Sequence, residues 1–322
     1  MIYKFVFSFV LLLISTININ AEIIGDSIVA IYNNWRINEE ATYQSYSSRT
    51  IIQGNDSTIT ESPSRSLTIL LKDTLPNSDL LFETKMQMPP LGEHGEFDKM
   101  EPLRKFFERY NEVLKRPYSF LTDTYGVIKE ICNYDLIREE VDSCFLVLQD
   151  IVHTLDISED QKNAITSGFN NIIQQSLSKE SLQENAGIFK HYGLIYNIGT
   201  TSEKVKMPIP FFNNKEIDAD LTYTCDILKK TEESEVISIR TDAVYDSDQL
   251  TNLIATTLLT DDQQRKSGML DSDRPYIYFT QTEEYIIEVL SGTILQVETE
   301  KRTVSPDKSR IDYSIIQLTD FQ

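Results

Sequence analysis

The sequence is poor in basic residues, in glycine, and in the residue types that build metal and redox sites. Its 322 residues include 30 Lys and Arg against 50 Asp and Glu, a formal net charge of −20, with 11 Gly, three Cys and three His. The deficit of basic side chains argues against nucleic-acid binding, whose affinity comes mainly from neutralising phosphates. Neither a GxxxxGKS/T nor a GxGxxG motif occurs, so the usual phosphate-binding loops are not expected.

The three histidines lack the spacing of a zinc site. His94, His153 and His191 form no HxxxH, HxH or HExxH motif, so we expect them at helix ends or on the surface. No GxSxG motif marks a hydrolase nucleophile. Carboxylates are too numerous for a glycosidase-like pair to be excluded by counting, but none stands out. We therefore predict no catalytic residue and no cofactor.

Two acidic triplets have the composition of calcium ligands. These are Asp246–Asp248 and Asp271–Asp273, and neither continues into the twelve-residue loop with a central Gly and a final Glu. A helix cap by Ser247 or Asp248 is the favoured interpretation of the first triplet. We predict no metal site.

Cysteine usage does not indicate a disulfide scaffold. Cys132, Cys144 and Cys225 include no CxxC motif, and a chain of this length needs no cross-links to build a core. Small buried apolar groups are the favoured interpretation. One disulfide with a leftover thiol is the alternative for an exported chain.

The first 21 residues have the pattern of a removable export signal. Lys4 gives a short positive region, the apolar stretch from Phe5 to Ile14 is interrupted only by Ser8, and Ala21 suits the position before cleavage. The stretch is short for a membrane-spanning helix, and no later stretch approaches 18 uninterrupted apolar residues. We predict cleavage after Ala21 and no stable membrane span, with an uncleaved anchor as the alternative.

Alternating polarity dominates the mature chain. Every second residue is apolar in Glu216–Ile227, which predicts a strand with one buried and one wet face, of the kind found in antiparallel sheets. Glu235–Val244 should pair with it. Further strands are expected at Ala41–Ile52, Ser57–Leu71, Asp79–Met88, Tyr118–Thr122, Val127–Cys132, Tyr276–Thr280, Tyr285–Leu290, Thr293–Thr303 and Ser309–Leu318. The last four should form a four-strand meander.

Helical periodicity lies between the strands. Apolar residues recur at three- and four-residue spacing in Leu103–Leu114 and in a stripe from Leu136 to Leu155. Ser158 with Gln161 forms a capping box, and further helices are expected at Lys179–His191 and Ser247–Leu259. The elements together predict an α+β fold, a curved antiparallel sheet with segregated helices, built as one half-barrel or as two pseudo-repeated lobes.

The order of elements suggests three parts after the signal. We expect an N-terminal antiparallel sheet with one helix at 22–133, a helical segment at 134–192, and a C-terminal antiparallel sheet with one helix at 193–322. Both sheet parts have strands, a helix, and strands around a Gly turn. The shared order of elements has two interpretations. Either the two parts arose by internal duplication, or they look alike because antiparallel hairpins generally do.

Apolar strand faces and one proline-containing segment are the candidate binding surfaces. The segment Val205–Phe212 is apolar and bounded by polar residues, and its two prolines keep it out of a central strand. We favour a packing role, in which this segment covers the core as a lid. The alternative is that it offers an apolar surface to a ligand or partner. The predicted ligand-lining residues are Leu221, Tyr223, Ile227, Met207, Phe211 and Phe212.

Three short segments resemble a known family. Asp123–Ile128 has the form D-x-x-G-x-I, Pro208–Pro210 the form P-x-P before an alternating strand, and Ser291–Ile294 a second Gly turn. Together with the export signal they resemble uncharacterised exported proteins of Gram-negative bacteria, a domain of unknown function that transfers no catalytic residue. In style the chain is also similar to the periplasmic lipoprotein-carrier half-barrels, in which a curved sheet wraps helices and shelters a lipid.

We therefore predict an exported, non-enzymatic protein of the periplasm or the cell surface that binds an apolar ligand or a partner protein of the cell envelope. An envelope structural or interaction module with no small ligand is the first alternative, and a carboxylate-dependent hydrolase is the second. The acidic residues are spread over wet strand faces and helix starts, so their expected role is solubility.

Overall fold

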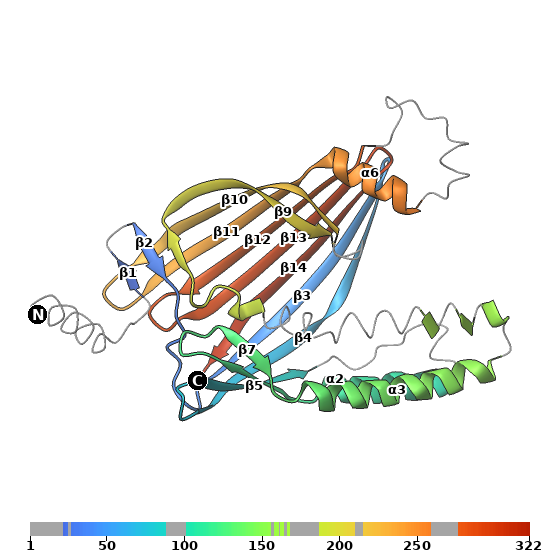
Figure 1. Ribbon diagram of the computed structural model, residues 1–322, viewed down its shortest axis with the longest axis horizontal. Coiled ribbons are helices and arrows are strands. Elements are labelled where there is room, and N and C mark those ends of the chain that lie inside the picture. Colours follow the sequence, from blue (N-terminus) through green and yellow to red (C-terminus); the bar gives the residue numbers. More distant parts are fainter. Residues whose placement is uncertain are drawn as a thin grey trace, which may run out of the picture.

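The strands of this protein form two antiparallel sheets (Figure 1). The computed structural model describes residues 22–24, 27–87, 101–155, 158–160, 162–163, 166–167, 187–209, 215–258 and 276–322. The small sheet has the order β1 (Glu22–Ile24), β2 (Ile28–Ala30) and β8 (Ile195–Asn197). The large sheet has 11 strands in the order β7-β6-β5-β4-β3-β14-β13-β12-β11-β10-β9.

The large sheet contains long strands. Its members in chain order are β3 (Glu40–Gln53), β4 (Asp56–Thr74), β5 (Leu80–Gln87), β6 (Tyr118–Thr122), β7 (Ile128–Ile131), β9 (Gly199–Ile209), β10 (Lys215–Lys230), β11 (Glu235–Tyr245), β12 (Tyr278–Glu288), β13 (Thr293–Ser305) and β14 (Lys308–Phe321). The strands predicted within 41–132 and 216–244 are confirmed. Pro208 lies in β9, at one edge of the sheet, where a missing backbone N–H is tolerated.

Among the described residues, three long helices and one turn of 3-10 helix accompany the sheets. They are α2 (Glu101–Leu114), α3 (Tyr134–Thr154), η2 (Gly187–Phe189) and α6 (Ser247–Leu258). Figure 1 shows α2 and α3 side by side as a hairpin that diverges from the long strands, whereas α6 lies at the far end of the sheet. The helices predicted at 103–114 and 247–259 are confirmed. Gln161 of the predicted capping box and most of the helix predicted at 179–191 lie outside the described residues.

The α+β class predicted from the sequence is wrong, because the fold is mainly β. Strands of up to 19 residues make one continuous sheet, and the described helices α2 and α3 diverge from it in Figure 1. The alternative of two lobes is wrong as well. The N-terminal and C-terminal strands belong to one sheet, because β3 and β14 are hydrogen-bonded neighbours. The boundaries at residues 133 and 192 stay a prediction.

The four-strand meander predicted at the C-terminal end is a meander of three strands. The polar residues Gln281–Glu284, which separated two predicted strands, continue a single strand β12 in unbroken register with β11. A polar stretch remains a strand when the alternate residues on one face have partners across the sheet and those on the other face meet solvent.

The apolar stripe of α3 differs from the predicted one by one position. Its buried residues are Ile137, Val141, Cys144, Leu148 and Val152, at spacings of three and four. Leu136, which was expected on this face, is 53% exposed. Ile137 is buried instead of Leu136, because Ile137 lies one helical turn before Val141 on the same side of the helix.

Candidate functional site

Two separate apolar clusters lie on one face of the large sheet, which we name the inner face. Odd-numbered residues of β10, β11 and β12 share this face through the strand register. The base cluster takes Cys225, Ile237, Ile239, Tyr285 and Ile287 from these strands, together with residues of β3–β7, α2 and α3. The distal cluster takes Ile217, Ala219, Leu221, Ala243 and Tyr245, and Leu250 of α6 covers it.

A row of polar residues crosses the inner face between the two clusters. The register places them directly opposite one another on six neighbouring strands, from β10 to β3. This polar row consists of Tyr223, Thr241, Glu283, Thr299, Ser314 and Ser47. Each of the six is half-buried, whereas the next row towards the base, which includes Ile239 and Tyr285, is mostly buried. The row is therefore where the filled core ends and a solvent-accessible inner face begins.

Glu283 is the charged centre of this row. Its carboxylate forms an ion pair with Lys190, and it accepts a hydrogen bond from Gln281 Nε2 at 2.8 Å. Its charge also helps to raise the pKa of Tyr223, after burial and together with Glu203. Because the row holds a single carboxylate, it offers no carboxylate pair of the kind that glycoside hydrolysis uses.

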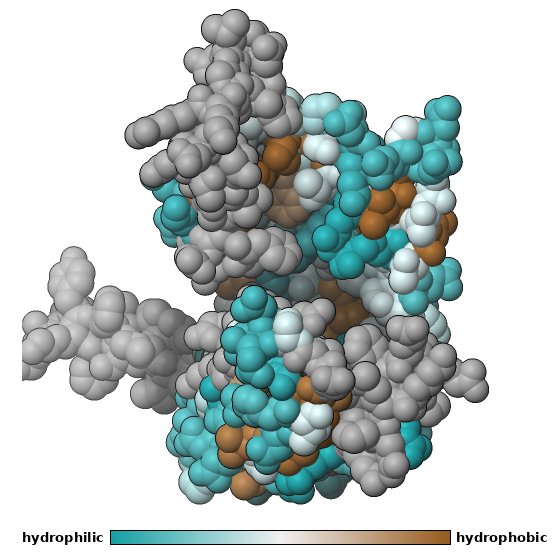
Figure 2. Space-filling view, turned by 90° about the vertical axis from the view of Figure 1, so that its right-hand side faces the viewer, coloured by the Kyte–Doolittle hydropathy of each residue, from teal (hydrophilic) through white to brown (hydrophobic). Residues whose placement is uncertain are grey.

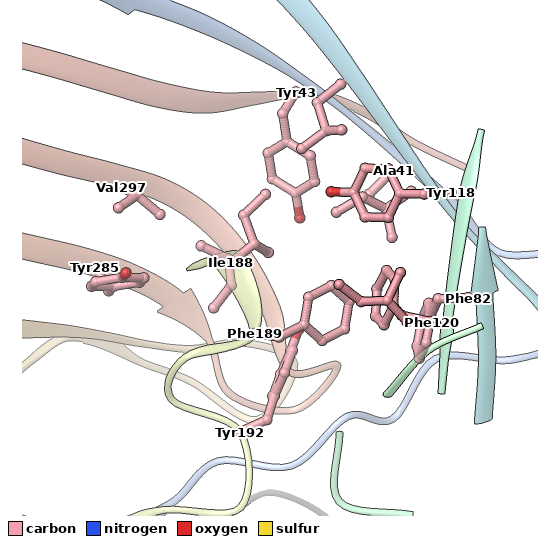
Figure 3. Packing of buried hydrophobic residues seen from close by; sticks show 14 of the residues in the cluster. Ala41, Tyr43, Phe82, Tyr118, Phe120, Ile188, Phe189, Tyr192, Tyr285 and Val297 are labelled. Atoms are coloured by element: carbon pink, nitrogen blue, oxygen red, sulfur yellow. The ribbon is translucent and has the colours of Figure 1, made fainter. Parts of the chain in front are cut away.

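Residues 187–198, which we name the covering segment, close the base of the inner face. Phe189 lies with its ring centroid 5.0 Å from those of Phe82 and Phe120, while the His191 ring lies 4.1 Å from the Tyr285 ring. β5 and β12 are five steps apart in the sheet, or ~24 Å if it were flat, whereas two residues of chain span only ~7 Å. The sheet therefore curves around the segment, as Figure 3 shows.

His191 is a buried neutral group at the edge of the base cluster. It is 3% exposed, and its Nδ1 lies 2.6 Å from the Tyr196 hydroxyl. Burial lowers the pKa of His191 to about 3, with the charge of Lys190 as a lesser cause. The predicted surface position is wrong for this residue, which follows the one-turn helix η2, because the sheet curves over the segment that carries it. His153 is exposed on α3, as predicted, and His94 lies outside the described residues.

Acid is expected to destabilise the protein through His191. Between its ordinary pKa of 6.5 and about 3, the unfolded chain binds a proton that the folded protein does not. Stability should therefore fall as pH falls through this window, at up to about 1.4 kcal/mol per pH unit. His191→Gln should flatten the dependence of the free energy of unfolding on pH, measured by urea titration at neutral and acid pH. His153→Gln is the control, and an equally steep fall in His191→Gln would contradict the assignment.

The three thiols are unsuited to nucleophilic chemistry. Burial, with a contribution from Asp226, raises the pKa of Cys225 to about 11, and burial also raises the pKa of Cys132 and Cys144. A thiol with a raised pKa is protonated at neutral pH and is a weak nucleophile. Cys144 and Cys225 are free and buried, as favoured above, whereas Cys132 is free but exposed.

The described members of the predicted ligand-lining set lie in two places. Leu221 is buried in the distal cluster, with Tyr223 and Met207 half-buried beside it, and Ile227 packs against the base cluster. Phe211 and Phe212 lie outside the described residues. Of the four described members, Tyr223 alone stands in the polar row, and ligand binding by the set stays a prediction.

Sequence reasoning missed Lys190, His191, Tyr196 and Glu283. Glu283 lay between two predicted strands, although counting alternate residues through Gln281–Glu284 would have placed it on the same face as Tyr285. The positions of Lys190 and His191 depend on how the covering segment crosses the sheet, which no local pattern encodes.

The two Gly turns that carried the family resemblance meet at one structural junction. Asn33 N donates to Tyr125 O at 3.2 Å, and Asn34 N donates to Ser291 O at 3.2 Å. Gly126 and Gly292 have positive φ angles of 94° and 70°. Tyr192, from the covering segment, donates from its hydroxyl to Gly292 O at 2.5 Å. Both motifs therefore have a structural role, closing the base beneath the candidate site.

One residue of the first acidic triplet caps a helix. Asp246 Oδ1 accepts a hydrogen bond from Gln249 N at 2.8 Å, so the cap of α6 is Asp246 and not Ser247 or Asp248 as predicted. Across the described ranges, no group of three or more His, Cys, Asp or Glu is arranged to hold a metal ion. The triplet at 271–273 lies outside those ranges. No helix in the described part of the chain is both long and apolar enough to cross a membrane.

Comparisons with known proteins give little that transfers. No protein-family model matches the sequence, and no curated protein matches it. A structure described as lipid–protein interactions in lipovitellin has 10% identity and a TM-score of 0.38 over 89% of this chain, which spans only 26% of the lipovitellin chain. A protein of Bacteroides fragilis, inferred to be exported and described as having a YmcC-like fold, has 8% identity and a TM-score of 0.25, covering 91% of this chain and 99% of that one. At these scores neither structure supplies an argument about the site.

Proposed function

We propose that this protein is an exported, non-enzymatic binding protein that holds an apolar ligand with a polar end against the inner face of its sheet. The observation that carries the proposal is the half-buried polar row between two apolar clusters on one curved face. On β10 and β11 this face offers apolar contact on both sides of a line of hydrogen-bonding groups, which is the usual composition of a site for a small apolar ligand. On β13, β14 and β3 the distal neighbours of the row are the charged residues Lys301, Asp312 and Arg49.

The space in front of this face supports the proposal. The base cluster joins the sheet to α2 and α3, so the helical hairpin stands on the inner-face side and diverges from the strands (Figure 1). Figure 2, seen from the diverging end, shows a hollow between the end of the sheet and the hairpin, with apolar side chains in its depth. The half-buried residues Phe279 and Ile254 pack against the distal cluster and offer further apolar contact on that side of the polar row.

Filling the inner face with a bulky side chain should block binding. Thr299→Trp places an indole on the polar row, whereas Glu300→Trp, the next residue of β13, places it on the opposite face. With the uncharged fluorescent probe N-phenyl-1-naphthylamine, Thr299→Trp should bind about tenfold more weakly than wild type, and Glu300→Trp should match wild type. Equal binding by the two variants would contradict the site.

Native mass spectrometry of the protein purified from its own cell envelope tests the same proposal without a chosen probe. A co-purifying lipid that is lost in Thr299→Trp supports binding on the inner face. A bare polypeptide mass together with no probe binding would overturn the proposal. The mass of the mature chain also tests the predicted cleavage after Ala21 in the same measurement.

A second candidate function rests on the other face of the sheet. Val244, Tyr278, Ile52 and Ile59 are 36–65% exposed near the distal ends of their strands, and the register places them on the outer face. Exposed apolar side chains on one face of a sheet favour contact with a partner protein. An interaction module is therefore the alternative, and its test is whether Ile59→Asp abolishes capture of a partner while probe binding persists.

A further inference from the structure

Three cations surround one carboxylate on the inner face, beside the polar row. Asp312 lies two residues before Ser314 on β14, so it shares the face of that row. In the strand register, Arg49 of β3 and Lys301 of β13 lie directly opposite Asp312, one on each side. Arg310 lies two residues before Asp312 on the same strand. We name these four residues, Arg49, Lys301, Arg310 and Asp312, the basic cluster.

The basic cluster is positively charged within a strongly acidic protein. Burial raises the pKa of Asp312, but hydrogen bonds from Arg310 and Arg49 outweigh it and hold that pKa below its ordinary value. Asp312 is therefore ionised at neutral pH. Three cations and one carboxylate give the cluster a net charge of +2, whereas the whole chain carries −20.

The opposite face of the neighbouring strands is acidic. Level with the basic cluster, the outer face of β12 and β13 carries Glu284, Glu298 and Glu300 against the single cation Arg302. An anion is therefore attracted to the inner face and repelled from the outer one. Lys190 does not compete for an anion at the inner face, because it is already paired with the carboxylate of the polar row.

Asp312 holds the two arginines at one place and leaves most of their donors unused. Arg49 Nε donates to Asp312 Oδ1 at 2.7 Å, and Arg310 Nε donates to Asp312 Oδ2 at 2.6 Å. The other N–H groups of both arginines, and the Lys301 ammonium, have no hydrogen-bond partner within the described part of the chain. The two arginine side chains are 52% and 41% exposed, so a ligand can reach them. Guanidinium groups bind carboxylates and phosphates through paired N–H donors.

Apolar contact lies within two strands of the basic cluster. Arg310 is opposite Thr303 of β13, and Thr303 is opposite Phe279 of β12. The Phe279 ring lies 4.8 Å from the Tyr245 ring of the distal cluster. Two strand spacings are ~10 Å in a flat sheet. A long acyl chain with its head group at the basic cluster can therefore cross these strands and reach the distal cluster.

We infer that the polar end of the ligand is an anion, a carboxylate or a phosphate, which binds Arg49, Arg310 and Lys301 while the apolar chain lies against the distal cluster. This inference rests on the proposed function and adds the charge class of the ligand. Asp312 is a positioning residue that holds the two guanidinium groups together.

Three probes with the same oleoyl chain test the charge class by their displacement of N-phenyl-1-naphthylamine. They are methyl oleate, the oleate anion and 1-oleoyl lysophosphatidate. Wild-type protein should prefer at least one of the two anions to methyl oleate by about tenfold, and the preferred anion distinguishes a carboxylate from a phosphate. The preference should shrink as salt is added, because exposed charges are screened.

Neighbouring residues of β13 supply matched variants. Lys301→Gln and Arg302→Gln each remove one positive charge from an exposed position, the first on the inner face and the second on the outer face. Lys301→Gln should reduce the preference for the anion about threefold, whereas Arg302→Gln should keep it. The double variant Arg49→Gln, Arg310→Gln should bind the anions and methyl oleate equally, with unchanged affinity for methyl oleate.

The outcomes separate this inference from the proposed function. If wild type shows no preference for an anion, or if Lys301→Gln and the double variant keep that preference, the inference is overturned while the binding function stands. An equal loss in Lys301→Gln and Arg302→Gln also overturns it, because overall charge would then explain the preference. If wild type binds neither the naphthylamine nor any oleoyl probe, the proposed function itself fails. Should the double variant not fold, Lys301→Gln carries the test, since it breaks no hydrogen bond among the described residues.

Discussion

Replacing Gly292 with alanine is expected to cost about 3 kcal/mol or more of stability, one of the largest effects of any single substitution in this protein. Gly292 has a φ of +70°, and an added Cβ would lie 1.9 Å from the carbonyl oxygen of Tyr32. Because both sides of this contact are backbone, no flexible side chain can move to relieve it. The free energy of unfolding, measured by urea titration, checks the prediction.

Gly54→Ala is the matched control for this experiment. Gly54 has a similar φ of +59° in the turn between β3 and β4, but an added Cβ would meet nothing within 4 Å. Its cost should be limited to the left-handed backbone conformation, about 1 kcal/mol. Similar losses in the two variants would show that the junction of Gly292 with Tyr32 is looser than the structure indicates.

Truncating Phe82 to alanine should destabilise the protein by about 3–5 kcal/mol, because it leaves a cavity at the centre of the base cluster. The Phe82 ring is fully buried and stacks on Phe120 at 5.3 Å, with Phe189 at 5.0 Å and Trp35 at 5.8 Å. The loss of contact with Phe189 should also loosen the covering segment, which thermal unfolding followed by Trp35 fluorescence would detect.

Phe321→Ala provides the comparison for Phe82. The Phe321 ring also contacts Trp35, at 5.3 Å, but it is 37% exposed. Its truncation should cost about 1 kcal/mol, since less apolar surface returns to water and solvent can fill the space. A loss for Phe82→Ala no larger than that for Phe321→Ala would mean that the base cluster is not a close-packed core.

Local pattern was sufficient to predict much of the sheet. The alternation from Ile217 to Ile227 identified β10 and its buried face, because side chains on a strand alternate strictly between the two faces. The spacing from Leu103 to Leu114 likewise identified α2. These signals are local, because they depend on whether a side chain is exposed to solvent or buried and not on which residues it contacts.

The fold class and the site could not be predicted in the same way. The polar residues Gln281–Glu284 look like a loop until β11 and β13 are known to lie on either side of them. The covering segment gives no periodic signal, yet it brings Lys190 to Glu283 and His191 to Tyr285. Such contacts depend on strand order and sheet curvature, which arise from pairings between residues far apart in the chain.

The pairing of β3 with β14 imposes an order of events on folding. Ala41 lies opposite Phe321, and Ile52 lies opposite Ser309, so this seam joins residues from opposite ends of the sequence. During synthesis the N-terminal part of the chain emerges first. The edge of β3 that pairs with β14 therefore stays unpaired until residues 309–321 have been synthesised. An unpaired edge of 14 residues invites pairing with other chains, and closing so long a loop is slow. Until the seam closes, pairing of this edge with another chain competes with correct folding.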